Sequence, residues 1–180
     1  MRSDSTTVID ELRRTIRDVN NFPKPGIVFK DVTPVLLEPA LLANAVQLMA
    51  EPFRAARINR VVSIESRGFL FGAPIALALG AGLVPIRKPG KLPAATQRVE
   101  YALEYGTDAL EMHHDAIQAG DRVLVVDDVL ATGGTANAAA QLVAATGATV
   151  VGFSFLIELD FLKGRERLSG RRVEALLHYA

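Results

Sequence analysis

The sequence predicts an α/β protein in which a parallel sheet is flanked by helices. Four short apolar runs rich in β-branched residues lie at 60–64, 83–86, 123–126 and 148–159. Helical stretches at 70–79 and 135–145 separate them, and strands that alternate with helices usually form a parallel sheet. The runs are continuously apolar rather than alternating with polar residues, which is typical of strands covered on both sides.

The N-terminal part is expected to hold two helices and a loop. Apolar residues recur at helical spacing at Val8, Leu12, Ile16 and Val19, which predicts a helix that ends near Asn20 and Asn21. The following segment, NFPKPGIVFKDVTPVL, is rich in proline and glycine and is interpreted as a loop with a short extended piece. Pro39 is expected to begin a second helix that continues through Met49.

Composition limits the function classes. The 180 residues suit one domain, and 49% hydrophobic residues suffice for a sizeable core. Lys and Arg together number 20, as do Asp and Glu, so no global charge favours a nucleic acid or membrane partner. The sequence has no cysteine, which excludes a disulfide framework, a thiolate nucleophile and a cysteine-based zinc site. These features are compatible with a cytoplasmic location.

One segment invites a membrane interpretation. Residues 68–86, GFLFGAPIALALGAGLVPI, carry no charge, and a span needs roughly 18 apolar residues. Glycines and prolines interrupt this run, so we expect a buried helix, a turn at 80–82 and a short strand. The charged N-terminus does not resemble a secretory signal.

The strongest chemical signal follows the strand at 123–126. Asp127 and Asp128 come first, and a short loop follows that consists of Ala131, Thr132, Gly133, Gly134 and Thr135. Glycines let backbone N–H groups converge, and the start of the next helix adds partial positive charge, so the loop is suited to a phosphate. No lysine follows the glycines, so this is not the P-loop of nucleotide triphosphatases.

Paired carboxylates would repel a phosphate unless another group lies between them. A ribose ring fits, because its hydroxyls can donate to Asp127 and Asp128 while its phosphate lies in the loop. The carboxylates would also favour positive charge on the sugar, as in an oxocarbenium-like transition state. The structural alternative is a strand that ends in acidic residues capping the next helix.

The segment 90–106 differs from the rest. Val99, Tyr101, Leu103 and Tyr105 alternate with more polar residues, which is typical of a half-buried ribbon. Its first half has few large apolar residues. We interpret it as a mobile flap, or hood, over a site.

These motifs resemble those of a known family. The run VLVVDDVLATGGT is similar to the phosphoribosyl pyrophosphate signature of type I phosphoribosyltransferases. Five further segments resemble the adenine phosphoribosyltransferases: FPKPGIVFKD (22–31), ESRGFLFG (65–72), RKPGKLP (87–93), YALEYG (101–106) and ELDFLKGRERL (158–168). The match covers nearly the whole chain in the right order. The resemblance implies the type I phosphoribosyltransferase fold as one domain, with residues 1–34 as its N-terminal helix and base-binding loop.

The resemblance also implies a reaction: adenine and phosphoribosyl pyrophosphate give AMP and pyrophosphate, as in purine salvage. Mg²⁺ would be carried mainly by the substrate's pyrophosphate and hydroxyls, without a dedicated protein metal site. Members of the family are typically homodimers, and a neighbouring subunit supplies one basic residue.

Pyrophosphate-binding residues can be carried over by position. Glu65, Ser66 and Arg67 match the loop that meets pyrophosphate, where the family usually has a cis peptide bond between positions 65 and 66. The residues that would neutralise pyrophosphate are Arg87, Lys88 and Lys91. Arg67 and Arg87 are expected to take part in catalysis, and Glu104 matches a flap glutamate that acts at the purine ring or shields the site.

The base-binding residues follow in the same way. Phe29 and Leu159 match the residues that sandwich adenine, and the backbone of Val28 and Lys30 would read its edge. A backbone carbonyl accepts and cannot donate, so such a site would reject purines that present an oxo group to it.

Two other functions are compatible with the motifs. One is a phosphoribosyltransferase for a different base. The other is a regulator that binds phosphoribosyl pyrophosphate without turnover, although 180 residues are expected to leave no room for a DNA-binding domain.

His113 and His114 lack further nearby ligands and are interpreted as polar residues rather than a metal site. The basic segment 163–172 is expected to be a solvated helix or loop.

Overall fold

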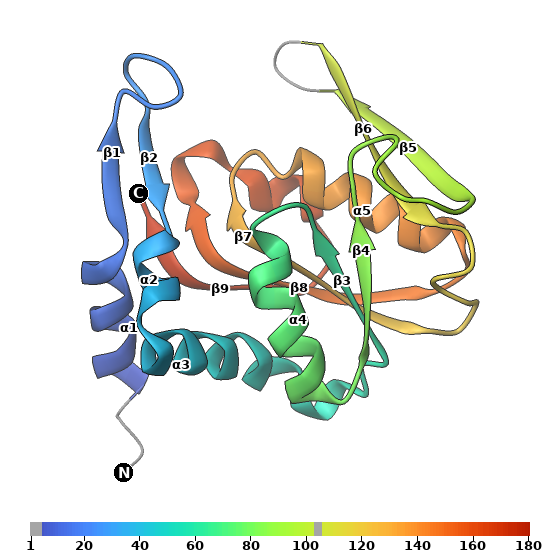
Figure 1. The fold of residues 1–180 in the computed structure, drawn as a ribbon, viewed down its shortest axis with the longest axis horizontal. Coiled ribbons are helices and arrows are strands. Elements are labelled where there is room, and N and C mark those ends of the chain that lie inside the picture. The colour runs from blue at the N-terminus through green and yellow to red at the C-terminus, as the bar shows by residue number, and fades with distance from the viewer. Residues whose placement is uncertain (1–4, 103–105) are drawn as a thin grey trace. The chain divides into compact units, whose positions relative to one another are not determined.

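The computed structural model describes residues 5–102 and 106–180 (Figure 1). The chain forms two compact units, residues 1–48 and residues 49–180.

The first unit contains helices and a hairpin. Helix α1 (Ser5–Thr15) leads into β1 (Arg17–Asn20), which pairs antiparallel with β2 (Val28–Asp31). Helices α2 (Thr33–Leu37) and α3 (Pro39–Ala50) follow, and α3 begins where the sequence predicted.

The predicted length of the first helix was wrong. The helix ends at Thr15, and Val19 lies in β1, opposite Phe29 of β2. Ile16 still donates a backbone hydrogen bond to the Leu12 carbonyl, at 3.0 Å. Val19 is apolar because it lies opposite Phe29 across the hairpin. Its position at helical spacing after Ile16 therefore does not indicate a longer helix.

The second unit confirms the parallel sheet. Its order is β4-β3-β7-β8-β9, and every neighbouring pair is parallel. The strands are β3 (Arg60–Ile64), β4 (Gly82–Ile86), β7 (Arg122–Leu130), β8 (Thr149–Leu159) and β9 (Val173–Tyr179). Helix α4 (Gly68–Leu79) packs against β3 and β7, and α5 (Gly134–Ala145) packs against β7 and β8. Short 3₁₀ helices cover Glu51–Ala56, Asp160–Leu162 and Gly164–Leu168. The second lies just before the basic segment 163–172, and the third lies within it.

A hairpin extends from this sheet. Strand β5 (Thr96–Ala102) pairs antiparallel with β6 (Thr107–His113), and Figure 1 shows the hairpin beside α5, against which it packs. The alternation in 99–105 predicted the first strand, whereas β6 and β9 were not predicted. Met49 and Met112 are buried in the core.

The uncharged segment 68–86 divides as predicted. It forms α4 and β4, joined by a turn in which Gly80 has a φ of 66°. Among the helices of the described residues, none is long and apolar enough to cross a membrane.

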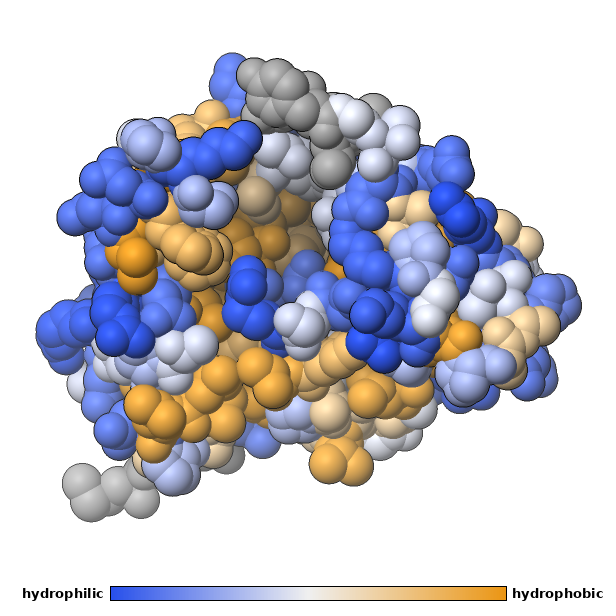
Figure 2. All heavy atoms as spheres, turned by 45° about the horizontal axis from the view of Figure 1, so that its top comes forward, coloured by the Kyte–Doolittle hydropathy of each residue, from blue (hydrophilic) through white to orange (hydrophobic). Residues whose placement is uncertain are grey.

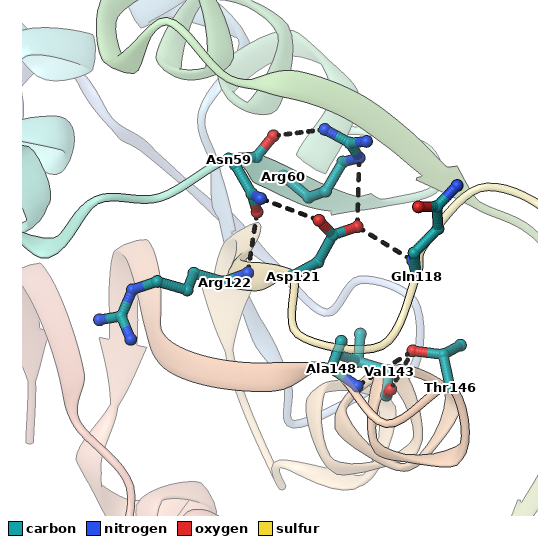
Figure 3. A network of polar contacts seen from close by, with 8 residues as sticks. All are labelled: Asn59, Arg60, Gln118, Asp121, Arg122, Val143, Thr146 and Ala148. Atoms are coloured by element: carbon teal, nitrogen blue, oxygen red, sulfur yellow. Dashed lines mark hydrogen bonds and ion pairs between the residues drawn. The ribbon is translucent and has the colours of Figure 1, made fainter.

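A network of polar contacts links the amino ends of β3 and β7 (Figure 3). Asp121 accepts hydrogen bonds from the Asn59 side chain (2.8 Å) and from the Gln118 backbone (3.0 Å). Asn59 in turn accepts the backbone N–H of Arg122 at 2.8 Å, and Arg60 lies 3.5 Å from the Asp121 carboxylate. The network therefore joins the starts of β3 and β7, at the end of the sheet opposite Asp127 and Asp128.

We expect Asp121→Ala to destabilise the protein by about 2 kcal/mol, because the buried carboxylate satisfies several donors at once. Denaturant unfolding measures this loss. The turnover number should stay within about twofold of the wild type, since the network lies away from the strand ends that carry the candidate site. A large loss of turnover in a folded variant would contradict this separation.

Candidate active site

The sheet brings three predicted loops together. Strands β4, β3 and β7 are neighbours, with Ile64 opposite Ile86 and Ser63 opposite Val126. Because parallel strands end at the same edge, the segments 65–67, 87–91 and 127–135 converge there. Residues far apart in sequence thus form one site within the second unit.

The paired aspartates lie within β7 rather than after it. The predicted strand end at Val126 was therefore too early, because β8 continues to pair with β7 as far as Leu130. Asp128 is only 4% exposed, and its carboxylate accepts a hydrogen bond from Arg67 Nε. Asp127 accepts the backbone N–H of Asp128 at 2.9 Å.

Gly68 lets α4 approach these carboxylates closely. A Cβ at this position would lie 2.8 Å from Asp127 Oδ1, so a side chain there would displace the carboxylate. This contact shields one side of the half-buried Asp127 carboxylate. Burial and the neighbouring charge of Asp128 raise the pKa of Asp127 well above its ordinary value of 3.8. In the ligand-free protein, the ionised pair is therefore electrostatically unfavourable.

The glycine loop forms the start of α5. Gly133 has a φ of 77°, a conformation that favours glycine, and its carbonyl accepts the first helical hydrogen bond, from Asn137, at 3.0 Å. The loop and Asp127 line a small pocket of about 80 Å³. The amino end of a twelve-residue helix therefore lies at this pocket, as the phosphate interpretation requires.

The loop after β3 is tied to the loop after β4. Glu65 Oε2 accepts hydrogen bonds from Arg87 Nε at 2.9 Å and from the Lys88 backbone at 3.0 Å. The peptide bond between Glu65 and Ser66 is cis, as the resemblance implied. The Arg87 guanidinium also donates to the Lys91 carbonyl at 3.2 Å, so all these predicted residues lie in one cluster.

Three cations of the site each face a carboxylate. Arg67 pairs with Asp128 and Arg87 pairs with Glu65. The third pair is Lys88 with Asp108, which comes from β6. The site therefore contains several positive charges that could bind an anionic ligand. In the absence of such a ligand, neighbouring carboxylates balance these charges.

The base-binding residues are distributed over both units. Leu159 ends β8, at the same sheet edge as Leu130 of β7. Phe29 lies in the β1–β2 hairpin, where its ring meets Phe22 edge-to-face at 5.2 Å. Val28 precedes it, and Lys30 pairs with Asp18 at 2.6 Å. The joint action of these residues on a base stays a prediction, and Glu104 lies outside the described residues.

Sequence reasoning missed three residues that shape the site. Glu111 accepts the Gly90 backbone N–H at 3.0 Å and exchanges both backbone hydrogen bonds with Arg87. Asp108 pairs with Lys88, and the backbone of Gly164 packs closely against the loop 131–135. A role for Gly164 could have been predicted, because it lies in the segment 158–168 that resembles the family. The two acids carried no local signal.

Comparisons with known proteins agree with this geometry. The model of the phosphoribosyl transferase domain matches residues 33–172. A curated relative from Myxococcus xanthus, named adenine phosphoribosyltransferase, is 58% identical over 97% of this chain and 95% of its own length. The chain belongs to the adenine phosphoribosyltransferase family.

Solved structures support the same family. The adenine phosphoribosyltransferase of Rhodothermus marinus superimposes with a TM-score of 0.93 at 53% identity, over 97% of this chain and 99% of that one. The Saccharomyces cerevisiae enzyme was solved in complex with adenine and an imino-altritol bisphosphate. It has a TM-score of 0.91 and 42% identity over 96% of this chain and 99% of its own. The predicted fold and the predicted function, phosphoribosyl transfer to adenine, are thereby confirmed.

The raised pKa of Asp127 gives a testable pH dependence. The folded protein binds this proton more tightly than the unfolded chain does. The carboxyl therefore stabilises the fold when it is protonated, and that contribution is lost as the pH rises through the folded-state pKa. We expect Asp127→Asn to raise the stability of the ligand-free protein by about 1 kcal/mol at neutral pH. The gain should shrink as the pH falls toward the ordinary value of 3.8.

Thermal unfolding across a pH series measures this difference. Asp115→Asn is the matched control, because Asp115 is exposed and its substitution should leave the melting temperature nearly constant. A gain that grows toward acid pH, or no gain at neutral pH, would show that the ionised Asp127 does not cost stability.

Proposed function

We propose that the protein transfers the phosphoribosyl group to adenine with the residues at the carboxyl ends of β3, β4 and β7. The observation that carries this proposal is the convergence of an acidic pair, a glycine loop and several cations at one sheet edge. Phosphoribosyl pyrophosphate has a ribose, a phosphate and a pyrophosphate, and each part finds a chemical match among these groups.

The acidic pair acts on the sugar. Asp127 and Asp128 accept hydrogen bonds from the ribose hydroxyls, and the loop 131–135 binds the ribose phosphate with its backbone N–H groups. As the bond between the sugar and pyrophosphate breaks, positive charge develops on the ring, and the carboxylates stabilise it. The purine nitrogen then forms the new bond to the same carbon and loses its proton, to solvent or to Glu104, the residue proposed to act at the purine ring. Arg67, Arg87, Lys88 and Lys91 neutralise the departing pyrophosphate.

The residues are compatible with Mg²⁺. The side-chain donors nearest the sugar are carboxylate oxygens, the ligand type that Mg²⁺ prefers, and Asp128 is engaged by Arg67. When bound, the metal would neutralise phosphate charge. This donor set favours an ion held mainly by substrate oxygens rather than by a cage of side chains.

Adenine recognition involves Phe29, Leu159 and the backbone of Val28 and Lys30. In support, the yeast relative was solved with adenine, and these positions lie in segments that match the family. Glu104 is proposed to act at the purine ring or to shield the site, within a flap formed by 90–106.

The test is direct. Protein, Mg²⁺ and phosphoribosyl pyrophosphate are mixed with each base in turn, and pyrophosphate release is followed together with the nucleotide product. We expect turnover with adenine and little with hypoxanthine, guanine or xanthine. Turnover with another base but not adenine would favour the other-base enzyme. Binding without turnover would favour a sensor. A cytoplasmic location stays a prediction.

We further propose that the protein is a homodimer. The α4 surface supports this: Leu70 and Leu77 lie seven positions apart on one helix face and are 46% and 84% exposed. Leu83, on the edge strand β4, is 42% exposed. Figure 2 shows hydrophobic surface in the region that α4 occupies in Figure 1. Contiguous exposed apolar surface of this kind commonly marks an interface.

We expect Leu77→Glu to convert the dimer to a monomer, because it would bury a charge on each side of a symmetric contact. Sedimentation equilibrium measures the mass. Leu37→Glu is the matched control, since Leu37 is also exposed, at 78%, but lies on α2. If the wild type sediments as a monomer, or if both variants dissociate alike, this surface is not the interface.

A further inference from the structure

Lys88 is held by two hairpin residues, Tyr101 and Asp108, to which the proposed function gives no role. Its ammonium pairs with Asp108 of β6, and the Tyr101 hydroxyl of β5 donates to the same carboxylate oxygen at 3.2 Å. Tyr101 and Asp108 stand opposite each other in the hairpin register. The ammonium also lies 5.9 Å from the centre of the Tyr101 ring. Lys88 is therefore directed toward the hairpin in the ligand-free protein.

The same tyrosine touches the phosphate loop. Thr135, in the first turn of α5, donates from its hydroxyl to the Tyr101 hydroxyl at 3.4 Å. A continuous polar connection therefore runs from Thr135 through Tyr101 and Asp108 to Lys88. It joins the loop proposed to bind the ribose phosphate to a cation proposed to bind pyrophosphate.

Asp108 differs from the other acids that balance the cations. Glu65 follows β3 and Asp128 lies near the end of β7, at the sheet edge that the proposed function places against the substrate. Asp108 comes from the hairpin and has no role there. The Lys88 and Asp108 side chains are 40% and 25% exposed, so their pair is partly solvated. Such a pair contributes little net free energy, and a polyanionic ligand can replace the carboxylate.

We propose that Asp108 is a positioning residue that competes with pyrophosphate for Lys88 and so sets the affinity for pyrophosphate-bearing ligands. In the empty site Asp108 holds the ammonium against the hairpin. When phosphoribosyl pyrophosphate binds, its pyrophosphate takes the ammonium, and after transfer Asp108 retakes it and favours release of the product. The Tyr101 hydroxyl orients the carboxylate for this exchange. This inference rests on the proposed function.

Asp108→Asn tests the competition, because the amide retains the shape and an acceptor for Tyr101 while it removes the charge. Calorimetry with Mg²⁺-pyrophosphate should show binding that is about three- to fivefold tighter than for the wild type. The KM for phosphoribosyl pyrophosphate should fall by a similar factor without a rise in kcat. Unchanged or weaker binding would overturn the proposal.

Glu100→Gln is the matched control. It removes the same charge from the adjacent strand, where Glu100 pairs with Arg98 rather than with Lys88. We expect its pyrophosphate affinity to stay at the wild-type value. An equal gain in both variants would mean that the general field, and not the contact with Lys88, is responsible, which would overturn the proposal.

A double-mutant cycle with Lys88→Met isolates the contact. Lys88→Met should weaken pyrophosphate binding, and in that background Asp108→Asn should no longer tighten it. Full retention of the Asp108→Asn effect without the lysine would refute the competition, as would a Lys88→Met variant that binds like the wild type. AMP formation by the wild type is measured alongside, so failure of the proposed function is seen separately from failure of this inference.

Discussion

Replacement of Asp127 and Asp128 together by asparagine is expected to lower kcat by about 10³-fold. The two amides keep the shape and some of the hydrogen bonds to a ribose, but they remove the negative charge that opposes the developing positive charge on the sugar. Because that charge exists only in the transition state, the loss should fall on kcat more than on ground-state binding. Steady-state kinetics at saturating adenine measures both quantities.

The structure sharpens this expectation in one respect. Asp128 carries the ion pair with Arg67, so its neutralisation also releases a cation that is proposed to bind pyrophosphate. We therefore expect the KM for phosphoribosyl pyrophosphate to change by less than about tenfold, since repulsion is removed as hydrogen bonds are lost. Glu174→Gln, at an exposed carboxylate paired with Arg172, serves as the control for general charge effects.

A specific outcome would contradict this account. If the double variant retained the wild-type kcat and showed only a higher KM, the carboxylates would act in substrate binding alone. Circular dichroism should confirm that the variant is folded. The raised pKa of Asp127 makes a folded variant the expected case, because the ligand-free protein is stabilised when the unfavourable charge beside Asp128 is lost.

Most of this site could be predicted because its signals are local. A buried strand followed by acids and glycines reveals itself in a single stretch of sequence, and parallel strands bring such stretches to one edge. The placement of Arg67, Arg87 and Asp128 in one cluster follows from the order of β4, β3 and β7. Motif and topology together therefore predict which of these residues lie close together at this sheet edge.

The parts that escaped prediction depend on tertiary context. Val19 has a helical spacing but pairs across a hairpin, and strand β7 continues through Asp127 because β8 supplies hydrogen-bonding partners beyond the apolar run. The partner of Lys88 comes from β6, a strand that was not predicted because its sequence, TDALEMH, does not alternate regularly between polar and apolar residues. A single sequence carries no sign of which distant acid a lysine will meet.

Gly133→Ala is expected to produce the second large effect, because the phosphate loop has no room for a side chain. A Cβ at Gly133 would lie 2.3 Å from the Gly164 carbonyl oxygen, and the glycine also has a φ of 77°. The new Cβ would clash with backbone atoms of Gly164, so no rotation of a side chain can relieve the contact. We expect a loss of about 3 kcal/mol or more in unfolding free energy, together with a KM for phosphoribosyl pyrophosphate raised more than about tenfold.

Gly170→Ala separates the two causes of that loss. Gly170 has the same φ of 77°, but nothing lies within 4 Å of a Cβ there. It should therefore lose only about 1 kcal/mol, the cost of a left-handed alanine, and keep its KM. Gly164→Ala approaches the same contact from the other side, since its Cβ would lie 2.1 Å from the Ala131 carbonyl oxygen. If Gly133→Ala lost no more stability than Gly170→Ala, the close packing of Gly164 beneath the loop would not hold the phosphate-binding conformation. The conformation would then depend on the φ of Gly133 alone.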